Sequence, residues 1–308
     1  MATSPIISIK DLHVEYTTLS GKKIHAVRGL SLEVFPGEVV GFIGPNGAGK
    51  STAIKTLLGF MRATSGTANI FGLPAGAIDA RRRIGFLPEV ALYYPFLTAR
   101  ETLRMYAKLA EIPKDKREDM ITDLLTKVKL LDRDKEPIRG FSKGMLQRVG
   151  IAQAIMGDPD LLILDEVTSG LDPVARYDVR KILLSFKGRG KTVFFSSHEL
   201  SEVTTLCDRV IMIDEGKVLV ESRLWDLLGG IRHFVTTVEA TRIPETLPYG
   251  VELRQSHNGQ QTFVSTSPEG HAALQTQLTA SKLRILETRE EAGSLEDFFV
   301  RSIGHKVS

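Results

Sequence analysis

Short runs of four to six mostly apolar residues recur along the chain and predict strands that are buried on both faces of a sheet. Segments with apolar residues at helical spacing separate these runs and predict helices over residues 53–58, 174–186 and 201–206. Strands that alternate with helices in this way are typical of a mostly parallel α/β core. The predicted core strands are Val39–Ile43, Ile84–Leu87 and residues 161–164, 191–196 and 210–213.

Other segments alternate apolar and polar residues instead. Residues 6–17 and 24–35 show this period of two, which predicts strands of a half-exposed antiparallel sheet. Residues 67–71 predict a further short strand, and residues 217–221 predict an edge hairpin after the turn Asp214-Glu215-Gly216. These segments add an antiparallel β subdomain to the parallel core.

A mostly helical insert is predicted over about residues 89–158, between two of the core strands. Thr98 and Glu101 have the spacing of a capping box, so the first helix begins directly after Thr98. The helices predicted in this insert cover residues 99–110, residues 120–131 and a stretch that begins after Gly140-Phe141-Ser142.

Gly229-Gly230 marks a candidate boundary between a first domain, residues 1–228, and a second, residues 231–308. The pattern after the boundary predicts the order β-β-β-α-β-α, which is typical of a small α+β C-terminal domain. Its predicted elements are a strand over 233–239, a hairpin around Asn258-Gly259, a helix over 269–280, a strand over 283–287 and a helix over 295–303.

Composition places the chain among ordinary globular proteins. Its 308 residues are 42% hydrophobic and 25% charged, which allows one large domain and one small one. No apolar stretch approaches the ~18 residues that a membrane-spanning helix needs, and the N-terminus lacks the segments of a signal peptide. Cys207 is the only cysteine, which excludes an internal disulfide and a cysteine-based metal cluster. We therefore expect a cytoplasmic location.

The formal net charge of +3 is only mildly basic. The densest basic runs are Arg81-Arg82-Arg83 and residues 114–117, and the second is mixed with acidic residues. Proteins that bind nucleic acid usually gather positive charge on one face, whereas these short runs are more typical of solvated helix faces. We expect no nucleic-acid partner.

One stretch matches the phosphate-loop pattern G-x-x-x-x-G-K-[ST] in full: Gly44-Pro45-Asn46-Gly47-Ala48-Gly49-Lys50-Ser51-Thr52. It lies between a predicted buried strand and a predicted helix, as the motif requires. Glycines let backbone N–H groups point inward around an anion, and the helix start adds further donors. The pattern predicts that Lys50 reaches the β- and γ-phosphates and that the Ser51 hydroxyl binds Mg²⁺. The alternative is a glycine-rich turn without a ligand.

A second motif, Asp165-Glu166, directly follows the apolar run at 161–164. Carboxylates at the carboxyl end of a buried parallel strand lie where open α/β sheets bind ligands. Asp165 is suited to hold Mg²⁺ through water, and Glu166 to orient or deprotonate an attacking water. The alternative is that two exposed acids simply end the strand, and the phosphate loop disfavours it.

With both motifs in place, the chain resembles the nucleotide-binding subunit of an ATP-binding-cassette (ABC) transporter over about residues 5–225. The resemblance implies an α/β P-loop NTPase core with an antiparallel β subdomain and a helical insert, and ATP and Mg²⁺ as cofactors. It also implies that Tyr16 stacks on adenine, which suits a flat aromatic ring. Packing of Tyr16 against the core is the alternative.

Phe141-Ser142-Lys143-Gly144-Met145 corresponds to the family's signature motif, usually Leu-Ser-Gly-Gly-Gln. Ser142 and Gly144 are retained, and the other three positions depart from the common form. The resemblance implies that a hydroxyl and a close backbone approach at this helix start contact the nucleotide held by a second copy of the chain. By itself, Ser142 indicates only an N-cap.

Two further residues follow in the family's order. Ser169-Gly170-Leu171-Asp172 resembles the loop that crosses the dimer interface, which implies a place for Asp172 at the nucleotide interface. His198 resembles the switch histidine that contacts the γ-phosphate, because it follows the strand at 191–196. Either ring nitrogen can donate to an anion, although a lone histidine at a strand end is more often structural.

Glu89 stands where most of the family has glutamine. A carboxylate there can meet Mg²⁺ or water, so Glu89 joins Ser51 and Asp165 as a candidate metal ligand. Type-2 ABC exporters often carry such an acid, a Lys-Gly-Met-like signature and an ending like Ser294-Leu295-Glu296-Asp297-Phe298-Phe299. Glu89 also lies at the start of the insert, where it can report the state of the nucleotide to a partner.

The resemblance therefore implies the Mg²⁺-dependent ATPase subunit of a type-2 exporter, on the inner face of the cell membrane. Its partners are a second copy of the chain and separate integral membrane permease subunits. A soluble ABC ATPase that acts on ribosomes or nucleic acid is one alternative, but such proteins usually have two cassettes or long coiled-coil insertions. A module that senses ATP without hydrolysing it is another, and Glu166 and His198 disfavour it.

Overall fold

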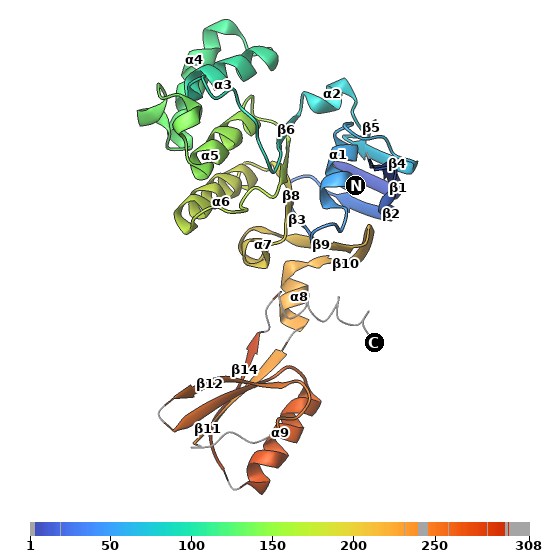
Figure 1. The fold of residues 1–308 in the computed structure, drawn as a ribbon, viewed down its shortest axis with the longest axis vertical. Helices are drawn as coiled ribbons and strands as arrows, with labels where there is room; N and C mark the ends of the chain where they lie inside the picture. The colour runs from blue at the N-terminus through green and yellow to red at the C-terminus, as the bar shows by residue number, and fades with distance from the viewer. Residues whose placement is uncertain are drawn as a thin grey trace. The chain divides into compact units, whose positions relative to one another are not determined.

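The computed structural model describes residues 4–18, 20–230, 232–239, 246–257, 259–281, 283–292 and 295. The chain divides into two compact units, residues 1–224 and 225–308 (Figure 1). The first residues of the second unit lie on helix α8 (Leu224–Gly230), and the glycine pair at 229–230 forms the end of that helix.

The first unit is built on a six-stranded sheet in the order β10-β9-β3-β8-β7-β6. Five of its strands are parallel, and β10 pairs antiparallel with β9 at the edge, which confirms the predicted hairpin. The central strands are buried along their whole length because their runs are apolar. The strands are β3 (Val39–Ile43), β6 (Ile84–Leu87), β7 (Leu161–Asp165), β8 (Thr192–Ser197), β9 (Arg209–Asp214) and β10 (Lys217–Arg223).

An antiparallel sheet in the order β2-β1-β4-β5 lies beside this core, as the alternating segments predict. Helix α1 (Lys50–Leu57) packs between the two sheets, where Ile54, Phe42 and Phe194 belong to one continuous apolar core. The ring centres of Phe42 and Phe194 lie 5.2 Å apart. The antiparallel strands are β1 (Ile7–Thr17), β2 (Lys23–Val34), β4 (Ser65–Ile70) and β5 (Leu73–Pro74).

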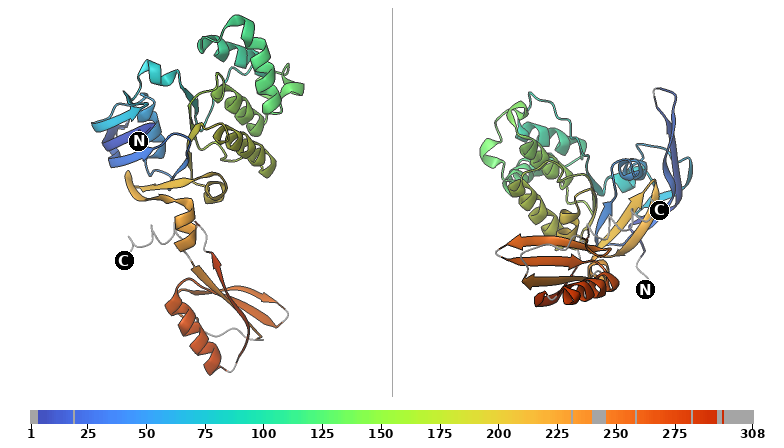
Figure 2. Two further views of the ribbon diagram at one scale, coloured as in Figure 1. Left: turned by 180° about the vertical axis from the view of Figure 1, so that it is seen from behind. Right: turned by 60° about the horizontal axis from the view of Figure 1, so that its bottom comes forward.

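The remaining helices of this unit include α2 (Ile78–Arg81), α6 (Pro173–Lys187) and α7 (Leu200–Leu206). Figures 1 and 2 show α6 and α5 on one side of the six-stranded sheet, with α1 and the antiparallel sheet on the other. A Cβ atom on Gly150 of α5 would lie 2.5 Å from a methyl group of Leu87, so a glycine permits this close approach of helix and sheet.

The insert contains α3 (Ala99–Leu109), α4 (Lys114–Lys127) and α5 (Lys143–Ala154). The capping box at Thr98 and Glu101 is present as predicted. The bounds of α4 differ from the predicted 120–131. Its first turn is charged and shows no apolar period, and the helix ends before Lys129, whose φ of 57° is left-handed.

The second unit contains a four-stranded antiparallel sheet in the order β12-β13-β11-β14, and α9 (Pro268–Ala280) covers one face of it. The predicted order β-β-β-α-β is present. The helix predicted over 295–303 lies outside the described residues except for position 295, and so does Asn258 of the predicted hairpin. The strands are β11 (Arg232–Glu239), β12 (Val251–His257), β13 (Gln260–Ser265) and β14 (Arg284–Ala292).

No helix in the part of the chain that the structure describes has both the length and the apolar character needed to cross a membrane.

A charged cluster joins the amino ends of three core strands. Asp160 accepts a hydrogen bond from Arg83 Nε at 2.8 Å, before β6, and from Lys191 Nζ at 3.0 Å, before β8. These hydrogen bonds, first that of Arg83 and then that of Lys191, hold the pKa of the Asp160 carboxyl below its ordinary value. The carboxylate therefore stabilises the fold above the unfolded-state pKa of about 3.9, and this contribution is lost as the pH falls through the lower folded-state pKa.

We expect Asp160→Asn to lower the free energy of unfolding of the first unit at pH 7 by less than about 1 kcal/mol, because the paired side chains are largely half-exposed. The difference from the parent protein should shrink as the pH falls below about 3.9, where the unfolded carboxyl is already protonated. Urea titrations at pH 7 and pH 3 measure this. An equal difference at both pH values would contradict the assignment.

Candidate functional site

A cavity of about 810 Å³ lies over the phosphate loop in the first unit. Four separate parts of the chain meet there: the β1–β2 hairpin, the loop before α1, the ends of β6, β7 and β8, and the β9–β10 turn. Its walls are formed by Tyr16, Ile24, His25, Ala26, Arg28, Asn46, Gly47, Ala48, Gly49, Lys50, Ser51, Thr52, Glu89, Glu166, Ser169, His198 and Glu215.

The phosphate loop has the backbone conformation that its glycines predict. Gly47 and Gly49 have φ angles of 83° and 104°, which favour glycine. A Cβ atom on Gly49 would lie only 2.4 Å from the carbonyl oxygen of Ala26, so the loop also needs glycine there for space. Helix α1 begins at Lys50, earlier than the predicted residue 53, and no side chain caps it. Its first N–H groups are therefore at the cavity and available to an anion.

Lys50 is buried inside the loop, with only 6% of its surface exposed. Its ammonium donates to the carbonyl oxygens of Gly44 at 2.7 Å and Pro45 at 3.2 Å. The same Nζ lies 3.3 Å from Glu166 Oε1. The lysine is thus held between the loop and the carboxylate, where it can meet the end of a bound phosphate chain.

Asp165 lies at the end of β7 and is buried. Its Oδ1 accepts hydrogen bonds from Ser51 Oγ at 3.2 Å and from Ser196 Oγ at 2.6 Å. The parallel register of β7 and β8 places Ser196 opposite Asp165. The hydroxyl of Ser51 and the carboxylate of Asp165 are hard oxygen ligands of the kind that Mg²⁺ prefers. This pair fits the metal site that the sequence predicts.

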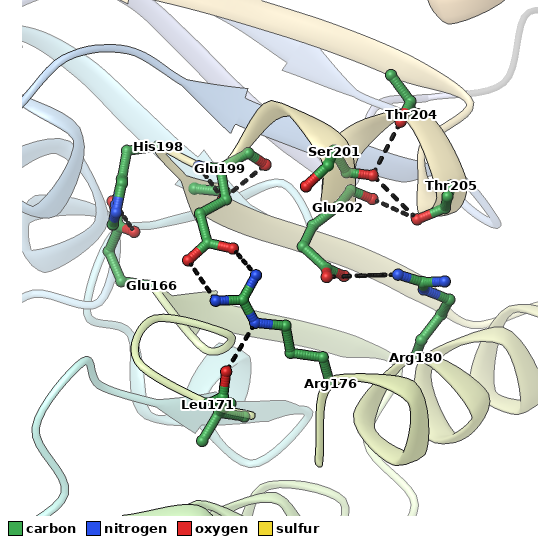
Figure 3. A network of polar contacts seen from close by, with 11 residues as sticks. Glu166, Leu171, Arg176, Arg180, His198, Glu199, Ser201, Glu202, Thr204 and Thr205 are labelled. Atoms are coloured by element: carbon green, nitrogen blue, oxygen red, sulfur yellow. Dashed lines mark hydrogen bonds and ion pairs between the residues drawn. The ribbon is translucent and has the colours of Figure 1, made fainter. Parts of the chain in front are cut away.

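Glu166 follows with a left-handed backbone, φ 52°, that is unusual outside glycine. Its N–H donates to the hydroxyl and the carbonyl of Ser196, which fixes this turn. Its Oε2 lies 2.5 Å from Nδ1 of His198, as Figure 3 shows. The buried carboxylate therefore contacts Lys50 with one oxygen and His198 with the other, and it can accept a proton from a nearby water.

Tyr16 and Glu89 also line the cavity, and their roles in adenine stacking and metal binding stay predictions. Tyr16 is 39% exposed at the end of β1, so one part of its ring is open to the cavity. Glu89 follows β6 and is exposed. The structure therefore brings Tyr16, Glu89, the phosphate loop, Glu166 and His198 to one cavity.

Ser142, Gly144 and Asp172 do not line this cavity within the chain. Ser142 caps α5 by accepting from the N–H of Met145 at 3.3 Å, and Asp172 caps α6 by accepting from Val174 and Ala175. A Cβ atom on Gly144 would make only ordinary contacts, the nearest at 3.5 Å with Ala175. Packing within this chain does not require a glycine at that position.

Several residues of the site belong to no sequence motif. Ser196 bonds both carboxylate-bearing residues, and His25 and Arg28 of β2 line the cavity. The signal for Ser196 is the Ser196-Ser197 pair at the carboxyl end of a strand next to Asp165. The signal for His25 and Arg28 is weak, since only the fold of the β1–β2 hairpin brings them to the phosphate loop.

The site fits a nucleoside triphosphate. Helix-start N–H groups and the Lys50 ammonium suit the phosphates, the β1–β2 hairpin offers an aromatic wall for a base, and Ser51 with Asp165 suits Mg²⁺.

Comparison with known proteins agrees with this geometry. Residues 27–169 match the ABC transporter family. An uncharacterized ABC transporter ATP-binding protein of Synechocystis sp. is 38% identical over 284 residues, which cover 92% of this chain and 79% of that protein. Nod factor export ATP-binding protein I of Ralstonia nicotianae is 31% identical over 314 residues, which cover 100% of this chain and 96% of that protein. A solved structure of an ATP-binding subunit of an ABC transporter has a TM-score of 0.65 at 32% identity and covers 72% of this chain and 91% of its own.

Proposed function

Because this chain belongs to the ABC transporter family as an ATP-binding subunit, we propose that it hydrolyses ATP in the presence of Mg²⁺ and so powers export through a separate membrane permease. One observation carries the hydrolytic part: Glu166 contacts both Lys50 and His198 beside the phosphate loop. A carboxylate in direct contact with the phosphate-loop lysine repels an anionic phosphate chain, whereas it is suited to activate a water.

In this proposal different residues of the chain bind the phosphates and activate the water. The helix-start N–H groups and Lys50 bind the phosphates and offset their charge. Glu166 orients the attacking water and accepts its proton, since one of its oxygens is held by His198 and the other by Lys50. When the His198 ring carries both protons, Nδ1–H donates to the Glu166 carboxylate and Nε2–H is left to donate to a phosphate oxygen.

Ser51 and Asp165 hold the metal ion in this proposal, and Glu89 faces the same cavity. When bound, Mg²⁺ would supply positive charge that offsets the negative charge developing on the phosphates during phosphoryl transfer. Ser196 keeps the Asp165 carboxylate in place through the 2.6 Å hydrogen bond.

A second copy of the chain completes the site in this proposal. Ser142 and Gly144 lie at the start of α5, away from the cavity of their own chain, and packing within the chain gives no reason for Gly144. A glycine and a hydroxyl at a helix start suit close contact with a phosphate from another copy. Two such copies would face each other about a two-fold axis, with Asp172 at the interface.

A groove in the first unit, with exposed apolar side chains at its edge, supports the permease as a partner. It has a volume of about 590 Å³ and lies between α2 and β6 on one side and α3 and α5 on the other. Ile78 and Leu109 at its edge are 68% and 72% exposed. Exposed apolar side chains that gather around a groove mark interaction sites. Residues 90–96 carry further exposed apolar side chains. They follow directly after Glu89, which lines the nucleotide cavity.

The relative named for Nod factor export supports the export direction in this proposal. The chain would then act in the cytoplasm on the inner face of the membrane, held there by the permease. The basic run at 81–83 gives no support to a nucleic-acid partner. Arg81 bonds the carbonyl of Gly76, and Arg82 and Arg83 pair with acidic side chains.

A pull-down from detergent-solubilised membranes of the source cells tests the partner. We expect the parent protein to retain one integral membrane protein, identified by mass spectrometry, and Leu109→Asp to lose it. Leu184→Asp, which changes an exposed leucine of α6, is the matched control and should retain it. ATPase activity stimulated by ribosomes or DNA, with no membrane protein retained, would instead support the soluble alternative.

A further inference from the structure

Two loops carry the residues that meet at the Glu166 carboxylate. One runs from Glu166 to the start of α6, and the other runs from the end of β8 through His198 and Glu199 to α7. Their catalytic side chains touch at the 2.5 Å contact between Glu166 and His198. His198 is 41% exposed, so its own packing does not fix its ring firmly against Glu166.

Arg176 of α6 joins the two loops a second time, as Figure 3 shows. Its Nε donates to the carbonyl oxygen of Leu171, at the end of the first loop, at 2.9 Å. Its Nη2 donates to Glu199 Oε1 at 2.9 Å, and its Nη1 donates to Glu199 Oε2. The guanidinium therefore bonds the backbone of one loop and the side chain of the residue next to His198.

Glu199 is itself held rigidly. Its N–H donates to Ser197 Oγ at 2.9 Å, and Ser197 Oγ donates back to the Glu199 carbonyl at 3.2 Å. These two hydrogen bonds fix the backbone next to His198, and Arg176 holds the Glu199 carboxylate. The links form a closed ring: Glu166, Leu171, Arg176, Glu199, His198 and back to Glu166.

We propose that Arg176 is a positioning residue, which through its bridge to Leu171 and Glu199 holds His198 against the Glu166 carboxylate. The proposal rests on the proposed role of Glu166 and His198 in hydrolysis. It requires arginine specifically, because a planar guanidinium can bond a carboxylate with two N–H groups and a carbonyl with a third. A lysine at 176 keeps the charge but cannot reproduce these three directions.

The chain offers a matched control one turn further along α6. Arg180 Nη2 lies 3.3 Å from both carboxylate oxygens of Glu202 on α7. This pair joins α6 to α7 itself with the same charges, yet Arg180 makes no hydrogen bond to either loop among the described residues. A role in stability alone predicts similar effects from both pairs.

We expect Arg176→Lys to lower kcat for ATP hydrolysis by about 10- to 100-fold, the scale of a misplaced catalytic group, with KM for ATP changed less than about threefold. Glu199→Gln should act in the same direction, and Arg180→Lys should leave kcat within about twofold. In a His198→Ala background, Arg176→Lys should cause almost no further loss, because its effect passes through His198. A full additional loss there, or equal losses from Arg176→Lys and Arg180→Lys, would overturn the proposal.

A second measurement does not depend on activity. The imidazole signals of His198 in a ¹⁵N-histidine NMR spectrum, assigned with His198→Ala, should shift in Arg176→Lys and stay in place in Arg180→Lys. Unchanged signals in both variants would overturn the proposal. A parent protein that shows no ATPase activity, with the His198 signals still shifting in Arg176→Lys, would instead count against the proposed function alone.

Discussion

Replacement of Glu166 by glutamine should lower kcat for ATP hydrolysis by about 10²- to 10⁴-fold, the usual contribution of a general base. The amide keeps the size of the side chain but cannot accept a proton from water. Affinity for Mg-ATP should be kept or increased, because the neutral amide removes a negative charge beside the phosphates and no longer neutralises the Lys50 ammonium, which the carboxylate contacts at 3.3 Å in the parent protein. Single-turnover hydrolysis and equilibrium ATP binding measure the two quantities separately.

The same variant should accumulate a dimer in the presence of ATP, since two copies that close on the nucleotide cannot hydrolyse it and reopen. Sedimentation with and without ATP detects this. Glu202→Gln is the matched control. Glu202 is also a buried glutamate with a cationic partner, Arg180, but it lies outside the cavity. Undiminished turnover in Glu166→Gln would remove the base assigned here.

Lys50→Ala should weaken ATP binding by about 10- to 100-fold, which corresponds to the loss of charge-assisted hydrogen bonds to the phosphates. The variant also leaves the buried Glu166 carboxylate without its cation, which adds repulsion toward the phosphate chain. ADP, whose phosphate chain is shorter, should lose less affinity than ATP. Titration of both nucleotides by calorimetry measures the difference.

Lys55→Ala is the control for this experiment, since Lys55 lies on the same helix and is exposed to solvent. It should bind both nucleotides as the parent protein does. Equal ATP affinity in Lys50→Ala and Lys55→Ala would show that the loop does not hold the phosphates through its lysine.

Much of the first unit follows from local patterns in the sequence. Apolar runs such as Val39–Ile43 predict their strands to the residue, because a strand buried on both faces selects apolar side chains at most positions. The charged first turn of α4 carries no such signal, and the predicted start of that helix is wrong by the length of that turn and more. Hydrophobic patterns predict helices and strands where burial selects apolar residues. They give no signal at exposed positions, where any polar residue is compatible with the structure.

The site divides in the same way. The phosphate loop and the carboxylates after β7 are local motifs with a backbone reason, and the structure brings them together. Ser196 and Arg176 have no motif, because their roles depend on the register of β7 with β8 and on the approach of α6 to α7. Such residues become visible only when the strands and helices are placed in space.

The left-handed backbone at Glu166 makes the demands of folding stability and of ATP hydrolysis conflict at one position. A non-glycine residue in that conformation costs about 1 kcal/mol relative to glycine, and the chain retains glutamate there. A directed-evolution screen that rewards heat resistance alone would therefore favour glycine or asparagine at position 166 and enrich inactive proteins. Thermostable versions of this subunit are better sought with position 166 held constant.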